Sequence, residues 1–236
     1  METVQSYEAT MEQIISSQIK KWQLNKKKKY KNPIRPVITI SRLPGSGANT
    51  LAKQLSEDLN IDLFDNEIVE EVAKSAHVSE SVIASLDEQD RSILDDWIGI
   101  LERKRHLWPD EYLPHLTKVV GAIAAHGHAI IVGRGSGHIL PSEICLRLLI
   151  VAPMDVRISN VMYAYDVTHK EAERRIMKTE KDRRAFVKQY FSADLTDPVN
   201  YDLTLNTAHY NVEAAVKIVK EAFNSRPWYD YSIKKS

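Results

Sequence analysis

Hydrophobic residues along the chain form short apolar runs that alternate with stretches of helical periodicity. Apolar and often β-branched runs predict five strands; they cover 37–40, 61–64, 129–132, 146–151 and 202–205. Apolar positions three or four residues apart predict amphipathic helices; these cover 50–59, 154–163, 169–184 and 212–223. Strands that alternate with helices favour an α/β fold, with a mainly parallel sheet between two layers of helices.

Two further helical stretches stand outside this alternation. Residues 6–24 predict an amphipathic helix, with apolar side chains at Tyr7, Met11, Ile14, Ile15, Ile19 and Trp22. We expect this helix to lie outside the main domain and to pack across its body or against a second copy of the chain. Residues 66–125 are helical in pattern almost throughout, with breaks expected near Pro109 and Pro114.

The first strand leads into a glycine-containing loop and then into a helix. Gly45 and Gly47 permit tight backbone geometry, and Leu51, Leu55 and Leu59 form the apolar stripe of the helix that follows. A strand, a glycine loop and a helix N-terminus direct backbone N–H groups toward one point, which is typical of a phosphate-binding site. A plain strand–turn–helix without bound phosphate is the alternative.

The phosphate-loop pattern G-x-x-x-x-G-K-[ST] is only partly met. Arg42 stands at the place of the first glycine, and Ala48 at the place of the lysine. We expect the Thr50 hydroxyl to contact the metal ion. We also expect Arg42 to supply the missing cation, because a guanidinium can donate two parallel hydrogen bonds to a phosphate.

Ligands of parallel sheets bind at the carboxyl ends of the strands, so the loops after the strands hold the other candidates. They contain Asp65, Arg134 between two glycines, and Asn206 with Thr207. Arg134 is expected to face a crevice, the alternative being a surface arginine in an ordinary turn. A dinucleotide fingerprint fails here because His138 occupies the position of its last glycine.

A charged helix precedes the last strand. Its basic residues are Arg174, Arg175, Lys178, Lys181, Arg183 and Arg184, and acidic residues are interleaved with them. Two interpretations stay open: a solvated helix with i,i+4 ion pairs, or a mobile cationic lid that closes over phosphates and supplies arginines to the reaction.

Composition narrows the class of protein only slightly. Basic and acidic residues number 32 each, which makes nucleic acid an unlikely general partner. The basic run Lys26–Lys29, with Lys31, is interpreted as a solvated linker, the alternative being a contact with nucleic acid or an acidic membrane. No segment approaches the roughly 18 apolar residues of a membrane span, and the start of the chain has no secretory signal pattern.

Single residues of reactive type fit structural roles. Cys145 is alone, which fits a reducing cytoplasm, and its apolar neighbours predict a core position. His126 and His128 lack further metal ligands at suitable spacing. Trp97 and Trp108 are expected to anchor the core or an interface.

Five motifs follow one another along the chain: VITISRLPGSG, LFDNEIV, IIVGRGSGHIL, LIVAPMDVRI and YDLTLNT. In this order they resemble the cytidylate kinase-like family of P-loop proteins, and the resemblance extends over residues 37–224. The resemblance implies a P-loop three-layer sandwich for this domain, with a helical acceptor-side insert at 66–125 and a lid at 164–200. It is preceded by an N-terminal helix and basic linker at 1–36 and followed by a tail at 225–236.

The same resemblance implies the site residues. The phosphate loop that would hold ATP falls on Gly45, Ser46, Gly47, Ala48, Asn49 and Thr50. Asp65 matches the aspartate of the nucleoside monophosphate region, and Arg134 matches the arginine that contacts the acceptor phosphate. Gly135 replaces the aspartate that follows that arginine. The lid matches at Lys181, Asp182, Arg183 and Arg184.

These observations lead to a functional hypothesis. We expect a cytoplasmic, Mg2+-dependent phosphotransferase that moves the γ-phosphoryl group of ATP to a small phosphorylated or hydroxylated acceptor, with CMP or dCMP as the first candidates. Arg42, Arg134, Arg183 and Arg184 are the expected catalytic residues. One alternative is a nucleotide-binding regulatory protein without turnover, because of Ala48 and Gly135. Another is a structural module that uses its N-terminal helix and helical insert as contact surfaces, including contact with a second copy.

Overall fold

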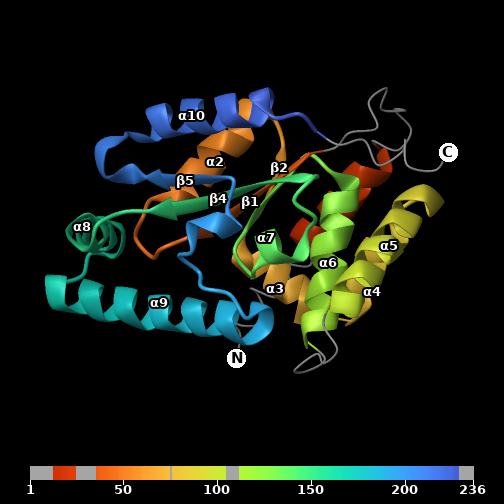
Figure 1. Cartoon of the computed structure of the whole chain (residues 1–236), viewed down its shortest axis with the longest axis horizontal. Coiled ribbons are helices and arrows are strands. Elements are labelled where there is room, and N and C mark those ends of the chain that lie inside the picture. The colour runs from red at the N-terminus through yellow and green to blue at the C-terminus, as the bar shows by residue number, and fades with distance from the viewer. Residues whose placement is uncertain (1–12, 25–35, 75, 105–111, 229–236) are drawn as a thin grey trace.

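The computed structural model describes residues 13–24, 36–74, 76–104 and 112–228. Its centre is a five-stranded sheet of order β2-β3-β1-β4-β5, in which every pairing is parallel (Figure 1). The strands are β1 (Val37–Arg42), β2 (Asp62–Phe64), β3 (Ala129–Val132), β4 (Cys145–Val151) and β5 (Leu203–Asn206). The predicted α/β class, strand number and parallel pairing are therefore confirmed.

Helices cover both faces of the sheet. One face packs on α2 (Ala48–Leu59) and α10 (Val212–Ser225), and its core includes Ile38, Ile40, Leu51 and Leu55. The other face packs on a group of helices that make up the insert (Figure 1). These helices are α3 (Asn66–Lys74), α4 (Ala76–Ala84), α5 (Glu88–Lys104) and α6 (Tyr112–His126). Alternate residues of each strand face opposite layers, which is why a sheet buried on both sides appears as continuous apolar runs.

Pro114 lies in the first turn of α6, so the helix begins near the proline and then continues through it. The proline is the third residue of the helix, where its missing N–H would have had no intrahelical acceptor in any case. The other expected break, Pro109, lies outside the described residues, as does Trp108.

Two helices follow β4, and the second lies within the predicted lid at 164–200. The first, α8 (Met154–Tyr165), follows β4, and α9 (His169–Phe191) runs from there toward α3 and α6 (Figure 1). The predicted helix 169–184 is thus longer by seven residues. Its last turns bring Phe186, Tyr190 and Phe191 against the core of the insert side. Short helical turns complete the chain: α7 (Ser136–Ile139), η1 (Pro198–Asn200) and η2 (Thr207–His209).

The helix at residues 13–24 packs on the body of the same chain. Ile15 and Trp22 are buried in the insert-side core, and the Trp22 ring stacks on His126 at 3.9 Å between centroids. The His126 ring is further fixed by Ser85, whose Oγ lies 2.8 Å from its Nε2. His126 therefore has the structural role expected for it.

Other expectations meet the structure as follows. Trp97 and Cys145 are buried, as predicted. Residues 6–12 of the N-terminal helix, the basic run at 26–31 and the tail beyond 228 lie outside the described residues. Within the described ranges, no helix combines the length and apolar character needed to cross a membrane.

Candidate active site

The phosphate loop between β1 and α2 depends on two left-handed glycines. Gly45 has φ +79° and Gly47 has φ +76°, a region that side chains with a Cβ rarely adopt. Gly45 also has no room for a side chain, because a Cβ there would lie 2.6 Å from the carbonyl oxygen of Arg157. The loop therefore requires glycine at this position for two independent reasons.

The helix that follows presents an uncapped N-terminus. Gly47 is its N-cap, no side chain caps it, and its first turn contains no acidic residue. The N–H groups of Ala48, Asn49 and Thr50 donate no hydrogen bond to the described parts of the chain. A helix N-terminus with free N–H groups attracts an anion through both hydrogen bonding and its dipole.

Two distant residues hold the loop in shape. Asn160 of α8 donates through Nδ2 to the Gly45 carbonyl oxygen at 2.8 Å, and Thr207 donates through Oγ1 to the Ser46 carbonyl oxygen at 2.9 Å. These two bonds fix the carbonyl groups of Gly45 and Ser46, and the Ser46 N–H donates within the loop to the Leu43 carbonyl oxygen at 3.2 Å. Thr207 was expected at this edge of the sheet; Asn160 gave no signal in the sequence.

The lysine position of the loop is filled by a core residue. Ala48 is 3% exposed and packs in the core between α2 and the sheet. Counted from Gly47, the hydroxyl position of the pattern falls on Asn49, and Thr50 is one residue further. Both side chains are exposed beside the helix N-terminus, so either could face a bound phosphate.

Arg42 at the end of β1 is buried, with 6% of its surface exposed. Its Nη2 donates to Oδ1 of Asn66, the first residue of α3. The same guanidinium lies against Gly133, where a Cβ would overlap Nη1. Gly133 therefore makes space for the Arg42 side chain.

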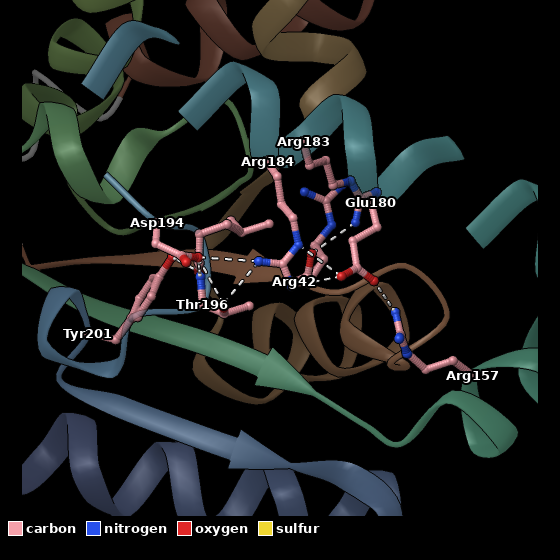
Figure 2. A network of polar contacts seen from close by, with 9 residues as sticks. Arg42, Arg157, Glu180, Arg183, Arg184, Asp194, Thr196 and Tyr201 are labelled. Carbon is pink, nitrogen blue, oxygen red and sulfur yellow. Dashed lines mark hydrogen bonds and ion pairs between the residues drawn. The ribbon is translucent and has the colours of Figure 1, made fainter. Parts of the chain in front are cut away.

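Three arginines that are far apart in sequence line one cavity of about 280 Å3. Arg42 comes from β1, Arg134 from the loop after β3 and Arg183 from α9. Arg183 also donates through Nη1 to the Arg42 carbonyl oxygen at 3.0 Å (Figure 2). The remaining wall is formed by Ser41, Asn66, Gly133, Gly135, Thr179, Asp182, Phe186, Val187 and Leu195.

The arginines perturb one another. Burial is the main reason that the pKa of Arg42 is lowered to about 9. Repulsion from the charges of Arg183 and Arg134 lowers this pKa further, and attraction from Asp65 partly opposes the shift. Burial lowers the pKa of Arg183, with Arg134 adding repulsion, and burial lowers that of Arg134. Arg42 still remains charged at pH 7. Cations held together against their own repulsion mark a place where an anion would be stabilised.

Arg134 is oriented by its neighbours. Its backbone is left-handed, with φ +51°, and its guanidinium forms an ion pair with Glu70 of α3. The guanidinium carbon also lies 5.8 Å from the centre of the Phe186 ring. The expectation that Arg134 faces a crevice fits its place in the cavity wall.

The predicted lid residues separate into two groups. Asp182 and Arg183 line the cavity. Arg184 instead forms ion pairs with Glu180 and Asp194 and donates to Thr196, and Glu180 also binds Arg157 of α8 (Figure 2). Lys181 is exposed. Toward the start of α9, Arg174 and Arg175 pair with Glu171, as the solvated-helix interpretation predicts.

Asp65 caps α3. One of its carboxylate oxygens, Oδ1, accepts from the N–H groups of Glu67 and Ile68, each at 3.0 Å. The carboxylate therefore starts the helix that carries Asn66 and Glu70. Because it attracts the Arg42 charge as well, it lies close to the arginine cavity.

The space beside Gly135 is filled by the ring of Phe191, the last residue of α9. A Cβ at this position would overlap the Phe191 ring, and that ring stacks on His138 at 5.1 Å between centroids. An aromatic ring from the end of α9 thus fills the space where a side chain at position 135 would lie.

Sequence reasoning missed Asn66 and Glu70, and it gave Glu180 only as one of the acidic residues interleaved in the charged helix. Asn66 directly follows the aspartate at the end of β2, and Glu70 lies one turn later on the same helix face. That spacing was the available signal, but it could not show that Arg42 and Arg134 lie opposite. Within the described residues, no group of three or more His, Cys, Asp or Glu side chains could hold a metal ion.

Comparison with known proteins decides the family. The model of the cytidylate kinase-like family matches residues 37–209. The chain belongs to the cytidylate kinase-like family. It is 27% identical over 201 residues to a cytidylate kinase of Methanopyrus kandleri, covering 81% of this chain and 94% of that protein. It is also 27% identical over 192 residues to a cytidylate kinase of Methanosarcina barkeri, covering 80% and 96%.

A solved structure shares the fold. An uncharacterised protein from Eubacterium ventriosum superposes with a TM-score of 0.57 at 23% identity, covering 81% of this chain and all of that one. The predicted resemblance and fold class are therefore both confirmed, for the family as a whole and for its α/β architecture.

Proposed function

We propose that this protein transfers the γ-phosphoryl group of ATP to a nucleoside monophosphate, with CMP or dCMP as first candidates. One observation carries the proposal: an uncapped helix N-terminus after a glycine loop lies at the same edge of the sheet as a cavity lined by three arginines. The relatives named cytidylate kinases support the acceptor class.

The donor phosphates would bind at Gly45–Thr50. Their oxygens would accept from the free N–H groups at the start of α2, in place of the lysine that the usual loop supplies. The exposed Asn49 and Thr50 side chains provide oxygen atoms beside this point. They fit Mg2+, which prefers oxygen ligands and is held largely by substrate phosphates and water rather than by a protein cage. When bound, Mg2+ would neutralise charge on the ATP phosphates.

The acceptor phosphate would bind in the arginine cavity. Arg134, held by Glu70, would orient it, and Arg183 would close the cavity from α9. An oxygen of the acceptor phosphate then attacks the γ-phosphorus, the bond from the γ-phosphorus to the β–γ bridging oxygen breaks, and ADP leaves. Positioning and charge stabilisation carry most of such a reaction, so three fixed guanidiniums are a suitable environment for it.

The test is ADP release with ATP, Mg2+ and a panel of nucleoside monophosphates. We expect turnover that saturates with one pyrimidine monophosphate and falls at least about tenfold in Arg134→Lys, which keeps the charge but removes the fork. Arg174→Gln is the matched control, because this arginine lies on the exposed face of α9. Absence of turnover with every acceptor would contradict the proposal.

A second candidate function is nucleotide binding without turnover. The buried Ala48 favours it, since no cation occupies the lysine position of the loop. Saturable, Mg2+-dependent ATP binding without ADP release would select this candidate. Failure to bind any nucleotide would leave a structural or partner-binding role.

A further inference from the structure

We propose that Arg42 binds the acceptor rather than the donor: with Arg134 and Arg183 it forms a cradle for a dianionic phosphate monoester that binds without ATP. The role of this site in binding an acceptor rests on the proposed function, whereas the anion site itself rests on the geometry of the three arginines. In the sequence, Arg42 was expected to replace the missing lysine of the phosphate loop. Its contacts in the fold point elsewhere.

Three contacts direct Arg42 into the cavity. Its Nη2 donates to Asn66, its Nη1 lies against Gly133, and its carbonyl oxygen accepts from Arg183. Asn66 and Gly133 follow β2 and β3, the two strands on the far side of β1 from β4 and β5. All three partners also line the cavity. The guanidinium is therefore fixed on the side where Arg134 lies.

The cavity has donors without acceptors. The Nε atoms of Arg42 and Arg134 are buried and have no hydrogen-bond partner among the residues that the structure describes. A buried N–H group of a cation that donates to nothing is unfavourable, and the penalty is larger for charged groups than for neutral ones. An anion that accepts from these atoms would remove the penalty, which favours occupancy of the cavity by an anion.

Nearby carboxylates balance only part of the positive charge. Glu70 pairs with Arg134, Asp65 caps α3, and Asp182 is exposed at the wall. Glu180 is bound by Arg157 and Arg184 (Figure 2). Arg42 and Arg183 have no ion pair with a carboxylate among the described residues. Two guanidiniums without a paired carboxylate match the charge of a phosphate monoester near neutral pH.

The volume of the cavity agrees with this ligand. About 280 Å3 is near the lower end for small-molecule sites. The arginines line one part, and the apolar Phe186, Val187 and Leu195 line another. Such a division suits a phosphate attached to a less polar group. It also means that inorganic phosphate alone should bind, although more weakly than a monoester.

Calorimetric titration without ATP or Mg2+ tests the proposal, using inorganic phosphate and CMP as probes. We expect both to bind the unmodified protein, and both to bind at least about tenfold more weakly to Arg42→Lys and Arg42→Gln. Binding of a non-hydrolysable ATP analogue with Mg2+ should change by less than about twofold in the same variants. Arg174→Gln, on the exposed face of α9, is the matched control and should bind all three probes as the unmodified protein does.

Because Arg42 is buried, Asn66→Ala provides a second variant that leaves the arginine in place. It removes the acceptor of Nη2 and should weaken phosphate binding several-fold, with near-ultraviolet circular dichroism confirming the fold. Loss of ATP-analogue binding with acceptor binding intact would assign Arg42 to the donor and overturn the proposal. Absence of phosphate and CMP binding by the unmodified protein would also overturn it. Anion binding that depends on Arg42 in a protein without turnover would retain the cradle and reject the kinase reaction alone.

Discussion

At the scale of single residues, position 133 must be glycine because the Arg42 guanidinium occupies the space beside it. Gly133 has φ +84°, and a Cβ there would overlap the Arg42 guanidinium. Gly47 has a similar φ of +76°, but nothing lies within 4 Å of the place where its Cβ would be. A substitution at Gly47 would therefore cause backbone strain alone, whereas one at Gly133 would cause backbone strain and overlap with Arg42.

Gly133→Ala is expected to destabilise the protein more than Gly47→Ala. Both substitutions place a Cβ in a left-handed backbone, at roughly 1–2 kcal/mol each, and only the first also displaces Arg42. Urea unfolding of both variants measures the difference. Phosphate titration should show weaker binding for Gly133→Ala, and equal unfolding free energies for the two variants would contradict the overlap.

At the scale of secondary-structure elements, packing fixes the C-terminal end of α9 on the rest of the protein. The C-terminal end of α9 is not a solvated extension of the charged helix, because Phe186, Tyr190 and Phe191 pack on the insert-side core. Phe191 fills the space that a side chain at Gly135 would need. The C-terminal end of α9 is consequently anchored at the loop that carries Arg134.

A larger side chain at Gly135 should reveal this anchoring. Gly135→Asp is expected to lower the unfolding free energy by about 1–3 kcal/mol, as overpacking usually does. In the Phe191→Ala background the same substitution should cost less, since the ring is gone. A double-mutant cycle by urea unfolding measures the coupling; additive effects would show that the ring and the new side chain do not meet.

The N-terminal helix at 13–24 belongs to the fold at the scale of the whole molecule. Trp22 is 7% exposed and stacks on His126, whereas Leu24 on the same helix is 66% exposed. The largest apolar side chain of this helix, Trp22, therefore packs against its own chain. A contact with a second copy through this helix stays a prediction.

Trp22→Ala is expected to reduce the unfolding free energy by about 3 kcal/mol, as for other buried aromatic side chains. Leu24→Ala should change it by less than about 0.5 kcal/mol, because that side chain is exposed. Chemical unfolding of both variants at equal protein concentration provides the measurement. Equal losses would mean that the helix does not pack as described.

Asp202 ties the amino-end side of the sheet to the segment after α10. It accepts from the Arg147 backbone and side chain and from Nη1 of Arg226. Burial raises the pKa of Asp202, but hydrogen bonds from Arg147 and Arg226 outweigh it, so the pKa lies below its ordinary value. A carboxyl with a lowered folded-state pKa stabilises the protein above its unfolded-state pKa of about 3.9, and this contribution is lost as pH falls through the folded-state value.

Asp202→Asn should therefore lower stability by about 1–3 kcal/mol at pH 7, and the difference from the unmodified protein should shrink below about pH 4. Glu171→Gln is the control: hydrogen bonds from Arg174 and Arg175 lower the pKa of Glu171 to about 2, but exposed pairs contribute little to stability. Urea unfolding at pH 7 and pH 3 distinguishes the two. A pH-independent difference for Asp202→Asn would reject the role of its charge.

The sequence by itself determined the five parallel strands, the glycine loop and the helical segments. These depend on local periodicity and on the backbone freedom of residues such as Gly45 and Gly47, which neighbouring residues already express. It also placed Asp65 and Arg134 at the correct edge, because parallel strands share one carboxyl end. Only the tertiary structure decided which residues the Arg42 side chain contacts. Its partners Asn66, Gly133 and Arg183 lie 24 to 141 residues away, and contacts over such separations come from packing of whole elements, which no local spacing encodes.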